Sequence, residues 1–142
     1  ALGGTPLPIE DVQVDYIKGA PGDLANLFHL PEKYCDDQIA LVSGYHEDLE
    51  VTVQDVNGDK NIVHTSTSGA PDKRRIAVIR DSFGTALMDF LPRYFANVDF
   101  YHWQAFDRSL LEENPPDAVI YLIVERDLTR IPQDVGKMVP EE

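Results

Sequence analysis

The chain has 142 residues, of which 12 are Lys or Arg and 25 are Asp or Glu, so its formal net charge is −13. This length suits a single domain, because domains typically contain roughly 100–200 residues. The acidic balance argues against nucleic acid as a partner, since binding to phosphates needs a basic surface. A lone cysteine, Cys35, excludes an internal disulfide and a cysteine-rich zinc site. No segment approaches the roughly 18 apolar residues of a membrane-spanning helix.

The first half of the chain, residues 1–72, is predicted to be irregular and rich in strands. Val12–Ile17 alternates apolar and polar residues, which predicts a half-buried strand. Asp23 is a suitable N-cap for a short helix after the turn that Gly22 ends. Leu49–Val56 alternates in the same way as the first strand.

A hairpin is predicted near the end of this first half. The segment 61–65 follows the alternating strand after Asn57 and Gly58, a pair that supplies the positive φ angles of a tight primed turn. Asp55–Asp59 also resembles the start of a calcium loop, but Gly58 lies two positions too early and Ser66 stands where a bidentate glutamate is needed. A hairpin turn is the favoured interpretation.

The second half, residues 73–142, has the pattern of a βαβαβ unit, with nearly continuous apolar strands separated by helices. Pro92 interrupts the first helical pattern, so that helix is expected to kink or end there. Right-handed crossovers between such strands predict a parallel sheet and an α/β fold. The predicted elements in chain order are Arg74–Ile79, Thr85–Phe95, Val98–Trp103, Asp107–Glu113 and Asp117–Val124.

Polar residues follow each of the three predicted parallel strands, where open α/β sheets bind ligands. Asp81 and Ser82 follow the first strand, His102 ends the second, and Glu125 with Arg126 follows the third. A serine at a sharp strand-to-helix turn exposes its Oγ and can attack an acyl carbon if a histidine takes its proton. The alternative interpretation is that Asp81 or Ser82 only caps the helix.

The segments Ile76–Gly84, Pro115–Ile120 and Val124–Leu128 resemble, in this order, the alginate O-acetyltransferase-like branch of the SGNH hydrolase superfamily. Gly22–Ala25 is similar to the stretch between that family's two catalytic blocks. The resemblance implies a three-layer, flavodoxin-like α/β fold. It also implies acyl transfer to alginate-like exopolysaccharide or cell-wall glycan outside the cytoplasm, in the periplasm, at the cell surface or anchored to the membrane through another region.

By this resemblance Ser82 is the nucleophile that carries the acetyl group, and Asp81 and Arg80 shape its turn. Glu125 and Arg126 match a family pair, which we interpret first as an ion pair that supports the site and second as a direct substrate contact. In this family the acetyl group arrives through a membrane-bound acyltransferase, so the resemblance implies no soluble cofactor.

The chain departs from the family in one respect, because no Asp-x-His occurs in it. The family places an Asp-x-His-Trp motif before the serine block, where it supplies the base. The chain is therefore expected to begin just after this motif, as a single partial domain spanning 1–142, and to show little turnover by itself. His102, followed by Trp103, is a weaker candidate base that Glu125 or Asp99 could orient; a half-buried histidine at a strand end is the favoured interpretation.

No metal site is predicted. The acidic clusters Asp36–Asp37 and His46–Asp48 are interpreted as solvated loops. Cys35 lies beside two aspartates, which would blunt the reactivity of its thiol. No nucleotide-binding glycine motif occurs.

Two functions from different classes remain open from the sequence. The first is the serine-bearing part of an O-acetyltransferase, and the second is a non-catalytic α/β module that binds glycan or protein at the same edge. A homodimer through an apolar face left uncovered in a partial domain is a further hypothesis.

Overall fold

The computed structural model describes residues 13–21, 28–29, 35–43 and 48–138. By its internal contacts the chain divides into two compact units, 3–47 and 48–142. The short helix predicted from Asp23 and the cluster around His46 lie outside the described residues. That the whole chain is one partial domain stays a prediction.

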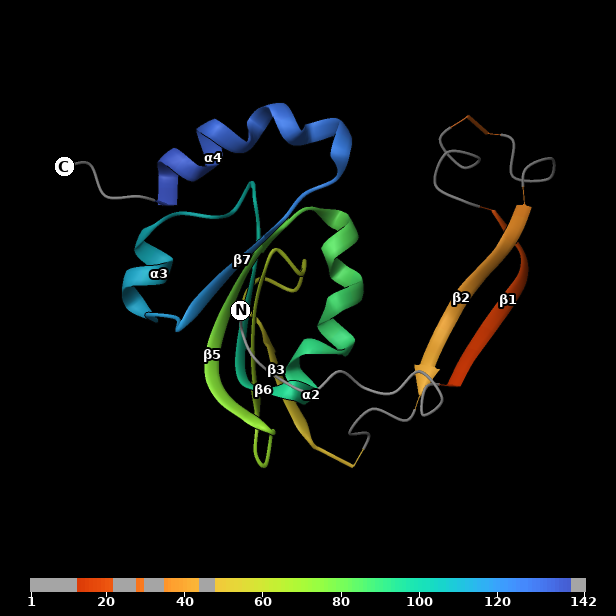
Figure 1. The fold of residues 1–142 in the computed structure, drawn as a ribbon, viewed down its shortest axis with the longest axis horizontal. Helices are drawn as coiled ribbons and strands as arrows, with labels where there is room; N and C mark the ends of the chain where they lie inside the picture. The colour runs from red at the N-terminus through yellow and green to blue at the C-terminus, as the bar shows by residue number, and fades with distance from the viewer. Residues whose placement is uncertain (1–12, 22–27, 30–34, 44–47, 139–142) are drawn as a thin grey trace. The chain divides into compact units, whose positions relative to one another are not determined.

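The described part of the first unit is an antiparallel pair of strands, β1 (Gln13–Pro21) and β2 (Cys35–Ser43) (Figure 1). The predicted strand at Val12–Ile17 is therefore present, although it extends further along the chain. Its partner β2 was not predicted. The pairing shifts register after Asp15 and again after Ile17, which is typical of β-bulges.

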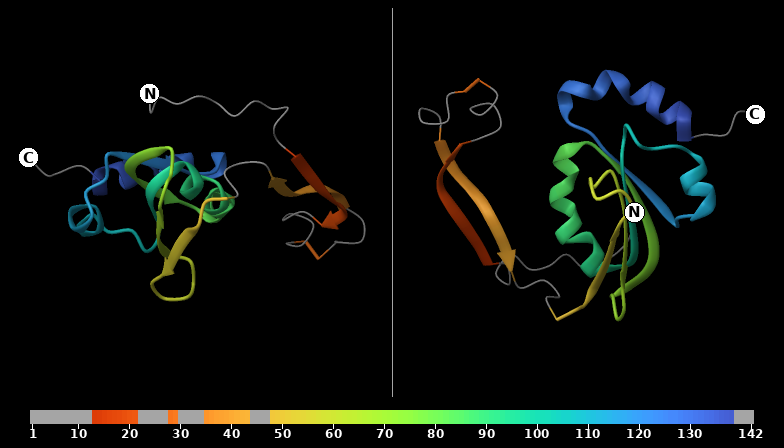
Figure 2. Two further views of the ribbon diagram at one scale, coloured as in Figure 1. Left: turned by 90° about the horizontal axis from the view of Figure 1, so that it is seen from below. Right: turned by 180° about the vertical axis from the view of Figure 1, so that it is seen from behind.

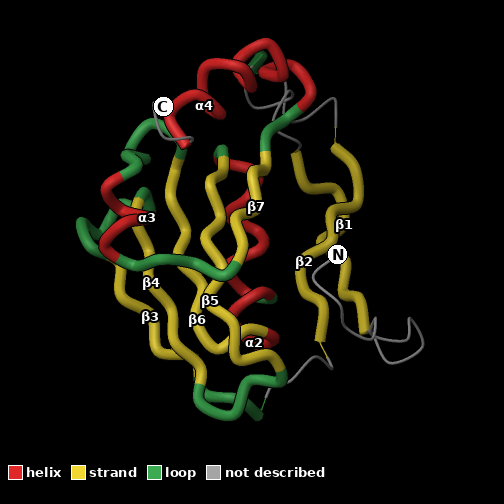
Figure 3. The backbone as a smooth tube through the Cα atoms, turned by 60° about the vertical axis from the view of Figure 1, so that its left-hand side comes forward, coloured by secondary structure: helices red, strands yellow, loops and turns green. Residues whose placement is uncertain are grey.

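The described part of the second unit contains a five-stranded sheet with the order β3-β4-β6-β5-β7, which Figure 3 shows as neighbouring yellow strands. Strand β5 is central and pairs in parallel with both β6 and β7. The bounds are β3 Val51–Asp55, β4 Ile62–Thr67, β5 Asp72–Arg80, β6 Phe95–His102 and β7 Ala118–Leu122.

The sheet is mixed, whereas a parallel sheet was expected. Strands β6, β5 and β7 form the predicted parallel part, so the α/β fold class is confirmed. The predicted hairpin β3–β4 joins this part through antiparallel pairing of β4 with β6. The alternation of apolar and polar residues identifies each strand, but it does not show which strands are neighbours in the sheet. The pairing of β4 with β6 was therefore not predicted.

Short helices cover both faces of the sheet, which gives three layers in the described part of the unit (Figure 2). Side chains of η2 and α2 pack on one face, and side chains of α3 and α4 pack on the other. No helix in the described part of the chain is long and apolar enough to cross a membrane. The bounds are η2 Ser82–Asp89, α2 Leu91–Tyr94, α3 Ser109–Glu113, η3 Glu125–Arg130 and α4 Ile131–Met138.

The predicted helix over Thr85–Phe95 is wrong in its extent. A 3₁₀ helix, η2, starts earlier, and α2 follows after a break at Phe90. Pro92 lies in the first turn of α2, where its missing N–H costs nothing, but it could not lie inside a continuous helix. Phe95 is the first residue of β6, and its buried side chain packs in the core as part of the sheet and not as part of a helix.

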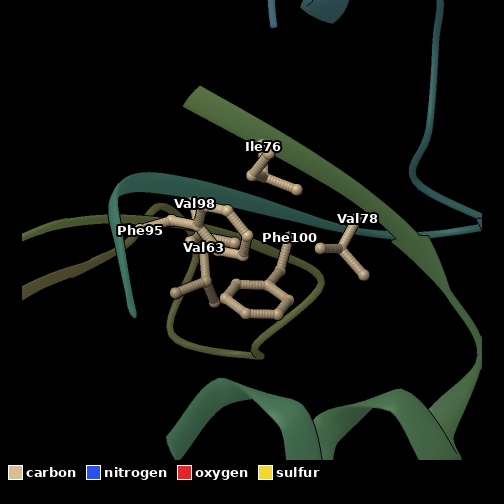
Figure 4. Close-up of a cluster of buried hydrophobic side chains, with 6 residues drawn as sticks. All are labelled: Val63, Ile76, Val78, Phe95, Val98 and Phe100. Carbon is tan, nitrogen blue, oxygen red and sulfur yellow. The ribbon is translucent and has the colours of Figure 1, made fainter. Parts of the chain in front are cut away.

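The two faces of the sheet hold two apolar clusters, because successive residues of a strand point to opposite sides. Ile76 and Val78 of β5 face one cluster, which Figure 4 shows, and Ala77 and Ile79 face the other. In addition to Phe95, β6 contributes Val98 and Phe100 to the cluster in Figure 4, and both are fully buried. The members shown are Val63, Ile76, Val78, Phe95, Val98 and Phe100.

The turn of the hairpin is longer than predicted. The loop between β3 and β4 spans residues 56–61, and its positive φ angles belong to Gly58 (+74°) and Lys60 (+58°). The Asp55 carboxylate accepts hydrogen bonds from the backbone N–H groups of both residues, at 2.9 and 3.0 Å. An aspartate that satisfies a turn in this way explains why the loop is wider than a two-residue turn.

Two valines at matched positions test the contribution of the core. Val98 is 0% exposed and Val53, also within a strand of this sheet, is 60% exposed. Val98→Ala is expected to lower the free energy of unfolding by about 2–3 kcal/mol, because it removes buried methyl groups and leaves a cavity. Val53→Ala is expected to cost less than about 1 kcal/mol. Urea denaturation of both variants measures this; equal losses would contradict the described core.

Candidate functional site

Ser82 lies where the polypeptide leaves the carboxyl end of β5 and enters η2. Strand β5 ends at Arg80, Asp81 is the N-cap, and Ser82 is the first residue of the 3₁₀ helix. Its side chain is exposed, and it makes no hydrogen bond within the described part of the chain. The carboxyl ends of β6 and β7 lie on either side, since both run parallel to β5. The predicted exposed serine is thus at the edge where α/β folds place ligands.

Asp81 fixes the conformation of this turn. It is 6% exposed, and its Oδ1 accepts a hydrogen bond from the Phe83 N–H at 2.8 Å. Its Oδ2 accepts one from the Val124 N–H at 2.7 Å, and its own N–H donates to the Leu122 carbonyl. Oδ1 therefore caps η2, and Oδ2 joins the end of β5 to the segment that follows β7. Asp81 caps the helix and orients the turn, and the hydroxyl of Ser82 is left available.

Arg80 connects the same turn to the hairpin. Its side chain is 3% exposed, with one Nη donating to the Asp81 carbonyl at 3.0 Å and the other to the Lys60 carbonyl. Its Nε is buried and has no partner within the described residues. Burial lowers the pKa of Arg80, and the neighbouring Asp81 charge opposes this shift. Arg80 therefore links the backbone of the serine turn to that of the hairpin loop.

Gly84 makes room for the Arg80 side chain. A Cβ at this position would lie 2.6 Å from the Arg80 Cβ and 3.1 Å from a methyl carbon of Leu122. The Gly84 N–H also donates to the Asp81 carbonyl at 3.2 Å. In the Asp-Ser-Phe-Gly sequence, Asp81 caps the helix and Gly84 leaves space for Arg80. Ser82 and Phe83, between them, are both exposed.

Glu125 and Arg126 do not form the ion pair that was expected. Both are exposed, and the Arg126 Nε lies 4.0 Å from a carboxylate oxygen of Asp127 instead. The Arg126 guanidinium also lies over the ring of Phe83, 5.6 Å from its centroid. Since Phe83 is adjacent to Ser82, this cation–π contact brings the end of β7 close to the serine turn. Phe83 was not singled out from the sequence, because one exposed aromatic residue carries no periodic signal.

His102 ends β6 and makes no hydrogen bond with Ser82. Its N–H donates to the Asn61 carbonyl at 2.7 Å, and its Nδ1 accepts from the Gln104 N–H at 3.4 Å. Partial burial, followed by the charge of Arg80, lowers the pKa of His102 below 6.5. A neutral histidine is a usable base, but the contact that would make His102 the base of Ser82 is not formed among the described residues.

The hairpin loop is a component of this edge that the sequence did not reveal. Lys60 and Asn61 accept hydrogen bonds from Arg80 and His102, so the loop lies against the ends of β5 and β6. Asn57 and Gly58 predicted a turn in the sequence, but they did not indicate that its loop would pack against the ends of β5 and β6. The Asp55 carboxylate, which had been compared with a calcium ligand, is bound to its own loop. The described residues contain no group of three potential metal ligands.

The described part of the second unit is thus a three-layer α/β arrangement with Ser82 directly after the carboxyl end of β5. No protein-family model and no curated protein matches the chain. Among solved structures, Bacillus cereus PatB1 with a sulfonyl adduct matches 88% of this chain and 50% of its own, with a TM-score of 0.66 and 14% identity.

Two further structures give the same result. A DHHW family protein from Eubacterium siraeum matches 95% of this chain and 55% of its own, with a TM-score of 0.67 and 12% identity. A second PatB1 structure matches 88% of this chain and 52% of its own, with a TM-score of 0.61 and 12% identity. The chain thus spans about half the length of these proteins. At such identities the likeness establishes the fold, which is half of the SGNH-like fold of PatB1.

The close approach at Gly84 gives a stability prediction. Gly84→Ala is expected to lower the free energy of unfolding by about 1–3 kcal/mol, because the new methyl group overlaps the Arg80 side chain. Gly136→Ala is the matched control: nothing lies within 4 Å of a Cβ there, and the residue is inside α4. This second change is expected to be neutral or to stabilise by up to about 1 kcal/mol. Chemical denaturation distinguishes the two, and equal effects would contradict the packing described.

The environment of His102 gives a pH prediction. Its folded-state pKa is below 6.5, so the unfolded chain binds a proton at higher pH than the folded chain does. His102 therefore contributes a loss of stability as the pH falls below 6.5, and this loss levels off below the folded pKa. His102→Gln is expected to make the acid-side decline of the free energy of unfolding shallower. Urea denaturation across this range, with an NMR titration of His102, measures both; a pKa at or above 6.5 would refute it.

Proposed function

We propose that this chain is the serine-bearing part of an SGNH-like O-acetyltransferase that acts on polysaccharide or cell-wall glycan outside the cytoplasm. The observation that carries the proposal is the Ser82 hydroxyl, which is exposed and unpartnered among the described residues while Asp81 holds its turn from both sides. The SGNH-like fold supports it, since this fold is shared with PatB1, a structure of which carries a sulfonyl adduct.

In the proposed reaction the Ser82 Oγ attacks the carbonyl carbon of an acetyl donor, and its proton passes to a histidine base. The bond to the donor's leaving group breaks, the base gives its proton to the leaving group, and an acetyl-serine ester remains. A sugar hydroxyl then attacks this ester and gives its proton to the same base, and the Ser82 oxygen takes a proton back. No metal or soluble cofactor enters these steps, and a membrane-bound acyltransferase is the proposed source of the acetyl group.

The N–H groups nearest to Ser82 restrict how the oxyanion is stabilised. Phe83 donates its N–H to the Asp81 carboxylate, and Gly84 donates to the Asp81 carbonyl. Neither is free for a developing oxyanion, which leaves the backbone N–H of Ser82 itself and donors from other segments at this edge. The Arg126 guanidinium, which lies over the adjacent Phe83 ring, is one cation at this edge.

The base is proposed to come from an Asp-x-His element of a longer protein, because this chain contains no such motif. Three observations favour a base from such an element over His102 as the base. His102 makes no hydrogen bond with Ser82, and its Nδ1 accepts a hydrogen bond from the Gln104 N–H. Burial and the charge of Arg80 also lower the pKa of His102. The acceptor glycan and the extracytoplasmic location follow from the family resemblance alone and are part of the proposal.

A second candidate function is a non-catalytic module that binds glycan or protein at the same edge. Among the described residues no histidine makes a hydrogen bond with Ser82, which favours this alternative. An exposed ring at Phe83, with Arg126 over it, would suit a binding surface as well as an acyl-transfer site. The two functions differ in whether the Ser82 oxygen is activated.

Covalent labelling of Ser82 distinguishes them. A fluorophosphonate is expected to label Ser82 in the full-length protein, with the phosphorus bonded to Oγ and fluoride released, and peptide mass spectrometry locates the adduct. The 142-residue chain is expected to label roughly 10²–10⁴-fold more slowly, since it lacks the base. The rate of p-nitrophenyl acetate hydrolysis should likewise be higher for the full-length protein than for the 142-residue chain.

Ser82→Ala is expected to abolish both signals. Ser109→Ala is the matched control, because Ser109 also begins a helix but donates its hydroxyl to Asp107 at 2.6 Å. A folded full-length protein that never labels at Ser82 would refute the transferase and support the binding module. Rapid Ser82-dependent hydrolysis by the 142-residue chain would instead refute the assignment of the base to a longer protein.

A further inference from the structure

A second polar site lies on the sheet face that α3 and α4 cover only in part. Two successive rows of the sheet are polar on this face: Thr52, Ser66, Asn97 and Arg75 in one row, and Gln54, His64 and Asp99 in the next. Together with Asn114 they line a pocket of about 410 Å³. The following row, which contains Ile62, Tyr101 and Ile79, is apolar and packs in the core cluster of this face.

Asp99 is the buried centre of this pocket. Its side chain is 1% exposed, and its Oδ1 lies 2.8 Å from the His64 Nδ1. Its Oδ2 accepts a hydrogen bond from an Nη of Arg75 at 2.7 Å. Arginine is always protonated, so a charged Asp99 is paired inside the sheet. Because a carboxylate only accepts hydrogen bonds, the His64 Nδ1 carries the proton of this contact, and Nε2 is the remaining polar atom of the ring.

The other side chains of the pocket have unused hydrogen-bonding groups. Within the part of the chain that the structure describes, the side chains of five lining residues make no hydrogen bond. Three of them are amides and two are hydroxyls, so each can both donate and accept. They come from three strands and one loop, and they are Thr52, Gln54, Ser66, Asn97 and Asn114.

Arg75 and Asp99 form an ion pair, so their two charges cancel within the pocket. A pocket whose other lining groups both donate and accept matches a ligand whose own groups do the same. Sugar hydroxyls have this property, whereas a carboxylate only accepts. The volume is also within the range of small-molecule sites.

We propose that this pocket is a saccharide-binding site, with His64 Nε2 contacting a sugar hydroxyl and the amides of Gln54 and Asn97 contacting its neighbours. The pocket is separate from the serine edge: it lies near the beginning of β5 and β6, whereas Ser82 and His102 lie at their carboxyl ends. It would bind glycan whether or not acyl transfer occurs at Ser82.

Disaccharide binding to the ¹⁵N-labelled 142-residue chain tests this site. Cellobiose, mannobiose and diacetylchitobiose are each titrated to millimolar concentration, with inorganic phosphate as the anionic probe. At least one disaccharide is expected to shift the amide signals of Gln54 and Asn97 and the Nε2 signal of His64. Asn97→Ala and Gln54→Ala, which remove partly or fully exposed amides, should each weaken its affinity roughly two- to tenfold.

Asn57→Ala in the exposed hairpin loop is the matched control and should leave the affinity unchanged. Failure of all three disaccharides would overturn the proposal and leave the Asp99 network with a structural role only. Binding of phosphate alone would overturn it in favour of an anion site. Disaccharide binding that neither pocket variant weakens would place the sugar elsewhere. None of these results depends on the labelling of Ser82, so the two proposals fail separately.

Discussion

The candidate active edge depends on the two hydrogen bonds that the buried Asp81 carboxylate accepts from Phe83 and Val124. One bond caps η2 and the other crosses to the end of β7, so a single side chain holds two segments that are 43 residues apart along the chain. Bonds to an ionised acceptor are among the stronger ones in proteins, and burial increases the cost of losing them. The position of Ser82 is therefore set by its neighbour and not by contacts of its own.

The buried charges of the second unit are paired locally although the whole chain carries a net charge of −13. Arg75 pairs with Asp99, whose carboxylate also bonds His64, and Arg130 pairs with Asp134. The two Nη atoms of Arg80 donate to backbone carbonyls, whereas its Nε has no partner among the described residues. Contacts within a few ångströms thus offset much of the cost of removing these ions from water. Net charge thus describes the surface and says little about the interior.

The sequence predicted the βαβαβ part of the fold, because continuous apolar strands such as that ending at Ile79 are buried on both faces and leave a strong signal. It also placed Ser82 at a strand end. It predicted an interruption of the helix near Pro92, which is found at Phe90, but not the pairing of β4 with β6 or the Asp99–His64 contact. These depend on which segments meet in space: His64 and Asp99 are 35 positions apart, and no local pattern links them.

The docking of the hairpin loop on Arg80 also affects how the chain folds. Both the β5–β7 pairing, which joins Ile76 to Ala118, and the β4–β6 pairing, which joins Ile62 to Tyr101, close long loops and have a large entropic cost. Arg80 gains the Lys60 carbonyl as a partner only when the hairpin loop has docked, and Asp81 gains the Val124 N–H only when β7 has paired. The serine turn therefore has all its contacts only after both long-range pairings have formed, so that a chain lacking either one does not display the ordered turn.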